Sequence, residues 1–173
     1  MKQAIFVDTR EKPKAIEKLS KQIEKQGYEL VRTKLYVGDY QLLTNPFLVI
    51  DRKQNLLELI GNVTQDHKRF KAELERAKDL GIHVVILCEH SKQVKTMDDL
   101  DYWHNPRIKT SPKATTGITL KKILKTMQMV YDVEFLFCDK SQTGNLIVKI
   151  LEEGAKEHER KEQESVGTNQ TSD

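Results

Sequence analysis

Hydrophobic and polar positions alternate along the chain with two periods, one typical of helices and one typical of strands. In 14–26, Ile16, Leu19 and Ile23 fall on one face of a helix, whereas 82–88 is a continuous apolar run, as in a strand covered on both faces. The predicted strands are 4–7, 28–36, 40–43, 47–50, 82–88 and 133–138. The predicted helices are 14–26, 55–60, 66–80, 119–131 and 144–151. We therefore expect an α/β domain with a mixed central sheet flanked by helices.

Length and composition predict one domain followed by a tail. A chain of 173 residues with 38% hydrophobic side chains is long enough for one core and too short for two. We place the folded domain at 1–151. Residues 152–173 are charged and then rich in Gly, Thr, Asn and Ser, so we expect a disordered tail there. The first residues include no apolar segment of secretory or membrane-spanning length, so we expect a soluble, cytoplasmic protein that does not bind membranes.

A basic stretch lies at 102–131, which contains no Asp or Glu, although the net charge of the chain is only +3. Such a stretch suits a DNA phosphate backbone, but for the lysines of its helix simple solvation is an equal alternative. The candidate DNA-binding residues are Arg107, Lys109, Lys113, Lys121, Lys122 and Lys125. The segment 98–117 is predicted to be a long loop with some local helix, and such a loop inside a compact domain is more often functional than idle. In it, Tyr102, Trp103 and His104 could stack on bases, or Trp103 could anchor the loop in the core.

Acidic and basic side chains gather around the predicted strands in three short runs: 7–11 (Val-Asp-Thr-Arg-Glu), 37–40 (Val-Gly-Asp-Tyr) and 49–53 (Val-Ile-Asp-Arg-Lys). The strand meander between the second and third runs brings Asp39 and Asp51 near each other. Carboxylates placed this way can hold a divalent cation against a phosphodiester. The three runs predict a metal-dependent nuclease with Mg²⁺ or Mn²⁺ as its cofactor.

An acidic residue two positions before a lysine is a weak pattern alone, since it also occurs at 66–68 and 159–161. Only Asp51 and Lys53 end an apolar strand of such a meander. Because side chains alternate faces along a strand, Asp51 and Lys53 project to one side and Arg52 to the other. This geometry lets the acid bind a metal while the lysine reaches a water molecule.

Each run also has an ordinary structural explanation. Asp8 and Arg10 could form a strand-end ion pair, and Asp39 after Gly38 could simply be a turn residue. The occurrence of all three runs in order favours the catalytic interpretation.

The ordered runs resemble the nuclease domain of the XPF-type structure-specific endonucleases, a branch of the PD-(D/E)xK superfamily. The match extends from 7–11 through 38–40 and 51–53 to 67–70 (His-Lys-Arg-Phe) and covers nearly all of 1–151. The resemblance implies a restriction-endonuclease-like fold and an endonuclease acting on branched, flapped or forked DNA, in DNA repair or recombination. Without the helicase and helix-hairpin-helix regions that often accompany such domains, the chain looks like a stand-alone, phage-like version.

Carried over by position, the resemblance implies that Asp39 and Asp51 bind the metal, with Asp8 close by or bridging through water. Lys53 would orient the attacking water, and Arg10 would contact the scissile phosphate or brace a carboxylate. The implied catalytic residues are Asp8, Arg10, Glu11, Asp39, Asp51 and Lys53. The implied supporting residues are Arg52 and Arg69.

Two positions depart from the family pattern. Asp51 stands where the family usually has Glu, and it is one methylene shorter. Leu57, with Glu58 beside it, stands where the family usually has Asp. The second departure concerns the supporting part of the site rather than the metal pair.

The resemblance implies DNA as the substrate, a homodimer as the expected assembly, and in one version a separate protein partner that positions the DNA. A different class of function is a non-catalytic scaffold subunit that binds DNA structures. Such subunits typically lose the acids or the lysine, and this chain retains them, which favours the enzyme.

Overall fold

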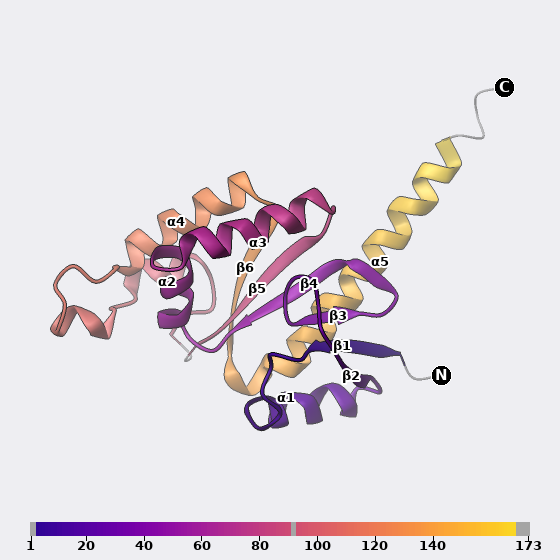
Figure 1. Cartoon of the computed structure of the whole chain (residues 1–173), viewed down its shortest axis with the longest axis horizontal. Coiled ribbons are helices and arrows are strands. Elements are labelled where there is room, and N and C mark those ends of the chain that lie inside the picture. Colours follow the sequence, from indigo (N-terminus) through magenta and orange to yellow (C-terminus); the bar gives the residue numbers. More distant parts are fainter. Residues whose placement is uncertain (1–2, 91–92, 169–173) are drawn as a thin grey trace.

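A computed structural model describes residues 3–90 and 93–168 of the chain. Within them lies one six-stranded sheet with the order β2-β1-β3-β4-β5-β6 (Figure 1). The strands are β1 (Ala4–Asp8), β2 (Glu29–Thr33), β3 (Tyr40–Leu42), β4 (Asn45–Lys53), β5 (His83–His90) and β6 (Val133–Asp139). β3 is antiparallel to both of its neighbours, and every other pair is parallel. The mixed sheet that we predicted is confirmed.

Helices cover both faces of this sheet. The α-helices are α1 (Pro13–Lys25), α2 (Leu56–Thr64), α3 (His67–Asp79), α4 (Gly117–Val130) and α5 (Thr143–Thr168). The 3₁₀ helices are η1 (Asp98–Tyr102), η2 (Pro106–Lys109) and η3 (Lys140–Gln142). The helices α2, α3 and α4 lie on one face, and α1 and α5 lie on the other (Figure 1). None of the helices in the described ranges combines the length and hydrophobicity needed to cross a membrane.

The two faces of the sheet have separate apolar cores, and β4 contributes to both. Val49 packs in the core under α2, α3 and α4, whereas its neighbour Ile50 packs in the core under α1 and α5. Continuing this alternation, Asp51 and Lys53 belong to the first face and Arg52 to the second. The register of β4 therefore decides which side of the sheet each charged side chain faces.

The strand predicted over 28–36 is shorter than expected. β2 ends at Thr33, and the following residues leave the sheet because their backbone binds elsewhere. The N–H of Leu35 donates to Asp8 Oδ2 at 2.7 Å, and Gly38 adopts a left-handed φ of 72°. The apolar pattern alone could not reveal this competing hydrogen bond.

The helix α5 continues into the segment that we expected to be disordered, and the structure thus corrects that expectation for 152–168. Glu157 and Lys161 lie four positions apart with an Oε1–Nζ distance of 2.9 Å, an arrangement that stabilises exposed helices. Charged composition suggested disorder, but this spacing favours a helix. Residues 169–173 lie outside the described residues, and the domain boundary at residue 151 stays a prediction.

Candidate active site

The predicted carboxylates meet at one edge of three neighbouring strands. Asp8 ends β1, Asp39 directly precedes β3, and Asp51 lies near the end of β4. A cavity of about 470 Å³ opens at this edge. Its walls include the predicted site residues Arg10, Glu11, Asp39, Asp51, Arg52, Lys53 and Arg69.

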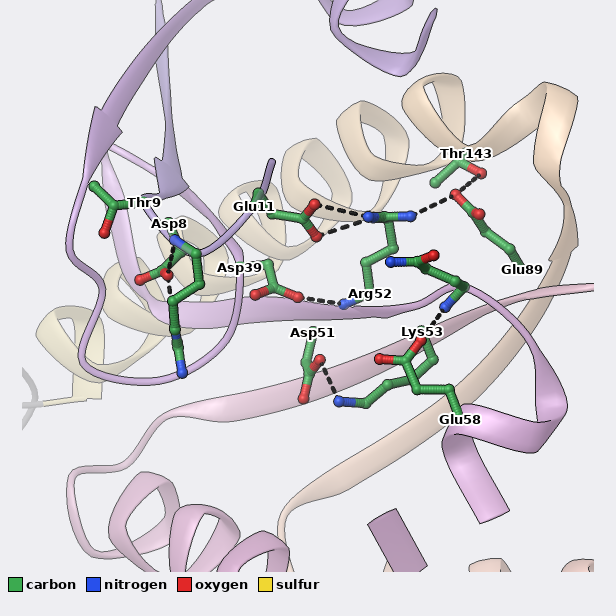
Figure 2. Close-up of polar contacts among 12 residues, drawn as sticks. Asp8, Thr9, Glu11, Asp39, Asp51, Arg52, Lys53, Glu58, Glu89 and Thr143 are labelled. Atoms are coloured by element: carbon green, nitrogen blue, oxygen red, sulfur yellow. Dashed lines mark hydrogen bonds and ion pairs between the residues drawn. The ribbon is translucent and has the colours of Figure 1, made fainter. Parts of the chain in front are cut away.

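Hydrogen bonds hold Asp39 beside Asp51. The Asp39 N–H donates to the Ile50 carbonyl at 2.8 Å, and Asp39 Oδ2 accepts from the Arg52 N–H at 2.9 Å (Figure 2). Gly38 permits this close approach, because a Cβ at that position would lie 3.1 Å from the Ile50 carbonyl oxygen and its φ is positive. The turn at Gly38 therefore positions the carboxylate of Asp39 beside Asp51.

The protein environment disfavours the charged form of the Asp39 carboxyl group. Burial raises its pKa well above the ordinary value of 3.8, and the nearby charges of Asp51 and Glu11 raise it further. The hydrogen bond from the Arg52 N–H and the charge of Lys53 oppose this shift without cancelling it. A divalent cation between the carboxylates would relieve the repulsion.

Lys53 points to the same side as Asp51, as predicted, with 2.9 Å between its Nζ and Asp51 Oδ1. The ammonium also lies 5.4 Å from the centre of the Phe70 ring. Burial lowers the pKa of Lys53, but the charge of Asp51 and its hydrogen bond dominate, and the pKa is raised overall. The lysine is therefore a fixed cation at the carboxylate pair.

Asp8 is fully buried, and both of its carboxylate oxygens accept hydrogen bonds. Oδ1 accepts from the N–H and the Nε of Arg10, at 2.8 and 2.6 Å, and Oδ2 accepts from Leu35. Arg10 Nη2 also donates to the Gly38 carbonyl at 3.2 Å. Asp8 is not among the residues that line the cavity, and its carboxylate orients Arg10. Its role as a metal ligand stays a prediction.

Arg52 lies on the opposite side of β4 within a buried ion network (Figure 2). Its Nε and Nη2 donate to the two carboxylate oxygens of Glu11 at 3.0 and 2.7 Å. Its Nη1 donates to Glu89 Oε1 at 3.3 Å, and the same oxygen accepts from the Thr143 hydroxyl at 2.9 Å. Glu11, predicted as catalytic, is thus held by Arg52 at the cavity wall.

The donor set at the cavity suits Mg²⁺ or Mn²⁺. Within residues 3–90 and 93–168, no group of three or more His, Cys, Asp or Glu side chains is arranged to hold a metal ion. The pair of Asp39 and Asp51 supplies hard oxygen ligands, and Mg²⁺ is usually held by one or two carboxylates while it keeps several waters. A bound cation would also offset the charges of Asp51 and Glu11, which, after burial, raise the pKa of Asp39.

The basic residues predicted to bind DNA do not line this cavity. Lys121 Nζ lies 2.7 Å from Asp98 Oδ1 and 2.6 Å from Asp101 Oδ2, so its charge is paired within the protein. Lys122 lines a different cavity of about 380 Å³. The remaining predicted residues are exposed: Arg107, Lys109, Lys113 and Lys125.

The alternative roles of the aromatic segment are separated by the structure. Trp103 is partly buried against the core and meets the His90 ring edge-on, with 6.1 Å between the ring centres. Tyr102 is 82% exposed. Trp103 therefore anchors the loop.

Sequence reasoning missed two members of the ion network, Glu89 and Thr143. Glu89 follows the apolar run 82–88 at the end of β5, so it had the same strand-end signal as the other acids. Thr143 begins α5 and had no signal in the sequence. The cavity wall also includes Lys12, Tyr36 and other polar residues that no motif indicated.

Comparisons with known proteins agree with this arrangement. Residues 7–150 match the family model of the ERCC4 domain. The structure is similar to XPF from Aeropyrum pernix, at 17% identity and a TM-score of 0.57, over 87% of this chain and 61% of that chain. It is also similar to XPF from Aeropyrum pernix in complex with DNA, at 16% identity and a TM-score of 0.61, over 89% of this chain and 66% of that chain. No curated protein matches the chain.

Proposed function

Because the chain belongs to the ERCC4 domain family, we propose that it is a divalent-metal-dependent endonuclease acting on branched, flapped or forked DNA. The family match agrees with the resemblance drawn from the three motifs, and the structural similarity confirms the restriction-endonuclease-like fold. The chain spans less than two thirds of the length of each of these solved XPF chains. Its substrate, its metal and its assembly are therefore parts of the proposal.

One observation carries the proposal: Asp39, Asp51 and Lys53 line a single open cavity. The carboxylates repel one another, while the lysine is fixed 2.9 Å from one of them. A purely structural ion cluster would pair its charges and close the cavity. The two carboxylates in this open cavity instead suit a cation, and the Arg and Lys side chains around them suit a phosphodiester.

Asp39 and Asp51 would hold Mg²⁺ or Mn²⁺, which when bound supplies Lewis-acid chemistry toward phosphorus and water. Lys53 Nζ would hold the attacking water through a hydrogen bond and stabilise its developing negative charge. Asp8 would orient Arg10, whose side chain is 62% exposed, toward a non-bridging oxygen of the scissile phosphate.

Glu11 and Arg52 would act as positioning residues. Arg52 is bound to Glu11 on one side, and its N–H is bound to Asp39 on the other. The network thereby fixes the backbone of β4 at Arg52, which lies between Lys53 and the predicted metal ligand Asp51.

The test is cleavage of labelled flap, fork, nicked and linear duplex DNA with Mg²⁺ or Mn²⁺. We expect cutting that depends on DNA structure, and no cutting by Asp51→Ala or Lys53→Ala. Exposed Asp79 and Lys14 supply matched controls, since Asp79→Ala and Lys14→Ala remove the same groups elsewhere. A melting temperature for each variant shows that it is folded.

Cleavage that survives both active-site substitutions would refute the proposal. Binding of forked DNA by the wild-type protein without cutting would instead support a scaffold. The homodimer that we expect is tested separately by sedimentation velocity over a range of concentrations.

A further inference from the structure

An exposed aromatic side chain, Tyr36, stands at the catalytic cavity without a role in the proposed chemistry. It is 66% exposed, and it lines the same cavity as Asp39, Asp51 and Lys53. A single exposed apolar group elsewhere on the surface would need no explanation. Its position in the wall of this cavity instead places it where the DNA substrate of the proposed reaction would lie.

The backbone holds Tyr36 in this exposed position. Leu35 and Val37 on either side are 8% and 2% exposed, so they anchor the chain in the protein. The Leu35 N–H donates to the buried carboxylate of Asp8 at 2.7 Å, and Gly38 then turns the chain toward Asp39. Since both neighbours point inward, the tyrosine ring projects outward at a fixed place.

Cations lie around the same cavity. Lys12 and Arg76 are exposed members of its wall, and the guanidinium of Arg10 is fixed by Asp8 and the Gly38 carbonyl. Proteins that bind single-stranded nucleic acid combine an aromatic ring, on which a base stacks, with a positively charged groove that follows the phosphates. The cavity contains the ring, and its lining carries six Arg and Lys side chains beside five acids, two of which are the proposed metal ligands.

We propose that Tyr36 stacks on an unpaired base of the DNA next to the scissile phosphate. This inference deepens the proposed function, because it names the substrate class as DNA with an unpaired nucleotide at the cleavage position. A base within a duplex has both faces covered by its neighbours, so it cannot present a face to the ring.

The experiment measures binding of forked DNA by fluorescence anisotropy in the Asp51→Ala background, which prevents cutting. A series of forks carries one abasic site at each successive nucleotide of the unpaired arm. We expect Tyr36→Ala to weaken binding of the intact fork about tenfold and Tyr36→Phe to bind as before, since stacking needs only the ring. At one position, the abasic site should weaken binding by the protein that retains Tyr36 by a similar factor. The same abasic site should not weaken binding by the Tyr36→Ala variant any further.

Tyr102 supplies a matched control, because it is 82% exposed and lies outside the cavity. Tyr102→Ala should keep the sensitivity to the same abasic position. The inference is overturned if Tyr36→Ala binds the intact fork normally, if the abasic effect is equal with and without the Tyr36 ring, or if Tyr102→Ala removes the same sensitivity.

Failure of this inference can be distinguished from failure of the proposed function. If the wild-type protein cuts forked DNA, and the Tyr36→Ala variant binds and cuts this DNA equally well, only the stacking inference is wrong. If the wild-type protein does not cut, the nuclease proposal is wrong, while the abasic series still tests the stacking.

Discussion

Asp8 and Asp39 lie at the ends of neighbouring strands, yet the structure shifts their pKa values in opposite directions. Asp8 is buried, which alone would raise its pKa, but hydrogen bonds from the side chain and backbone of Arg10 and from Leu35 lower it overall. Asp39 receives one backbone hydrogen bond and lies near other acids, so its pKa is raised. The donors around each carboxylate, rather than the local sequence, distinguish the acid that orients Arg10 from the acid that we propose as a metal ligand.

The lowered pKa of Asp8 predicts a pH-dependent contribution to stability. An acid whose folded-state pKa lies below its unfolded value stabilises the protein above the unfolded pKa, here near 3.8, and this stability is lost as the pH falls through the folded pKa. We expect Asp8→Asn to lower the free energy of unfolding by about 1–3 kcal/mol near neutral pH. The difference from wild type should shrink below the unfolded pKa.

Urea unfolding of both proteins at a series of pH values measures this difference. Asp79→Asn, at an exposed position, should match wild type throughout. A difference for Asp8→Asn that stays constant as the solution is acidified would contradict the role given to the charge.

At the scale of elements, Arg52 joins parts of the chain that are distant in sequence. Its guanidinium in β4 binds Glu11 before α1 and Glu89 in β5, and Glu89 in turn binds Thr143 at the start of α5. Burial alone would lower the pKa of Arg52, but the hydrogen bonds and charge of Glu11 raise it overall. The Arg52 guanidinium therefore stays charged between partners from distant parts of the chain.

Removing the shared cation should be costly. Arg52→Met leaves Glu11 and Glu89 buried without their partner, and we expect the free energy of unfolding to fall by about 3–5 kcal/mol. The triple variant Glu11→Leu/Arg52→Met/Glu89→Leu removes the charges together and should recover most of this loss. Denaturant unfolding measures the free energy of unfolding of the single and the triple variant. Equal losses in the two variants would show that packing, rather than unpaired charge, explains the effect.

At the scale of the molecule, the C-terminal part of α5 extends away from the rest of the domain (Figure 1). Its contacts with the sheet side along 152–158 include the hydrogen bond from the Tyr28 hydroxyl to Glu152 Oε1, at 2.6 Å, and the stacking of His158 on Phe47, with 5.0 Å between ring centres. Ala155 between them packs against the core. The side chains from Glu159 to Ser165 are all exposed. The stabilising part of the helix thus ends near His158.

Two truncations test this division. Removing 160–173 should change the free energy of unfolding by less than about 0.5 kcal/mol, because the described side chains in this segment, those of 160–165, are all exposed. Removing 152–173 should cost about 2 kcal/mol, because one hydrogen bond and one stacked ring pair are lost with it. Thermal unfolding measures both, and equal stability of the two truncated proteins would contradict the assignment.

Local patterns were enough to predict most of the elements and the pairing of Asp51 with Lys53. The helix over 14–26 and the strand over 82–88 follow from periodicity, which depends only on neighbouring residues. The alternation along β4 likewise places Asp51 and Lys53 on one face. The strand predicted over 28–36 failed beyond Thr33, because the Leu35 N–H found a partner 27 positions away in sequence.

The sequence by itself determined the alternation of helices and strands, the motif order and the chemical types available at the site, because these are properties of the covalent chain. The tertiary structure decided where each carboxylate lies and which groups it contacts. Asp8 is bound on both oxygens, Glu11 is held by Arg52, and Asp39 is placed beside Asp51. Hydrogen bonding and burial depend on groups brought together only by folding, and they set the charge and the freedom of each acid.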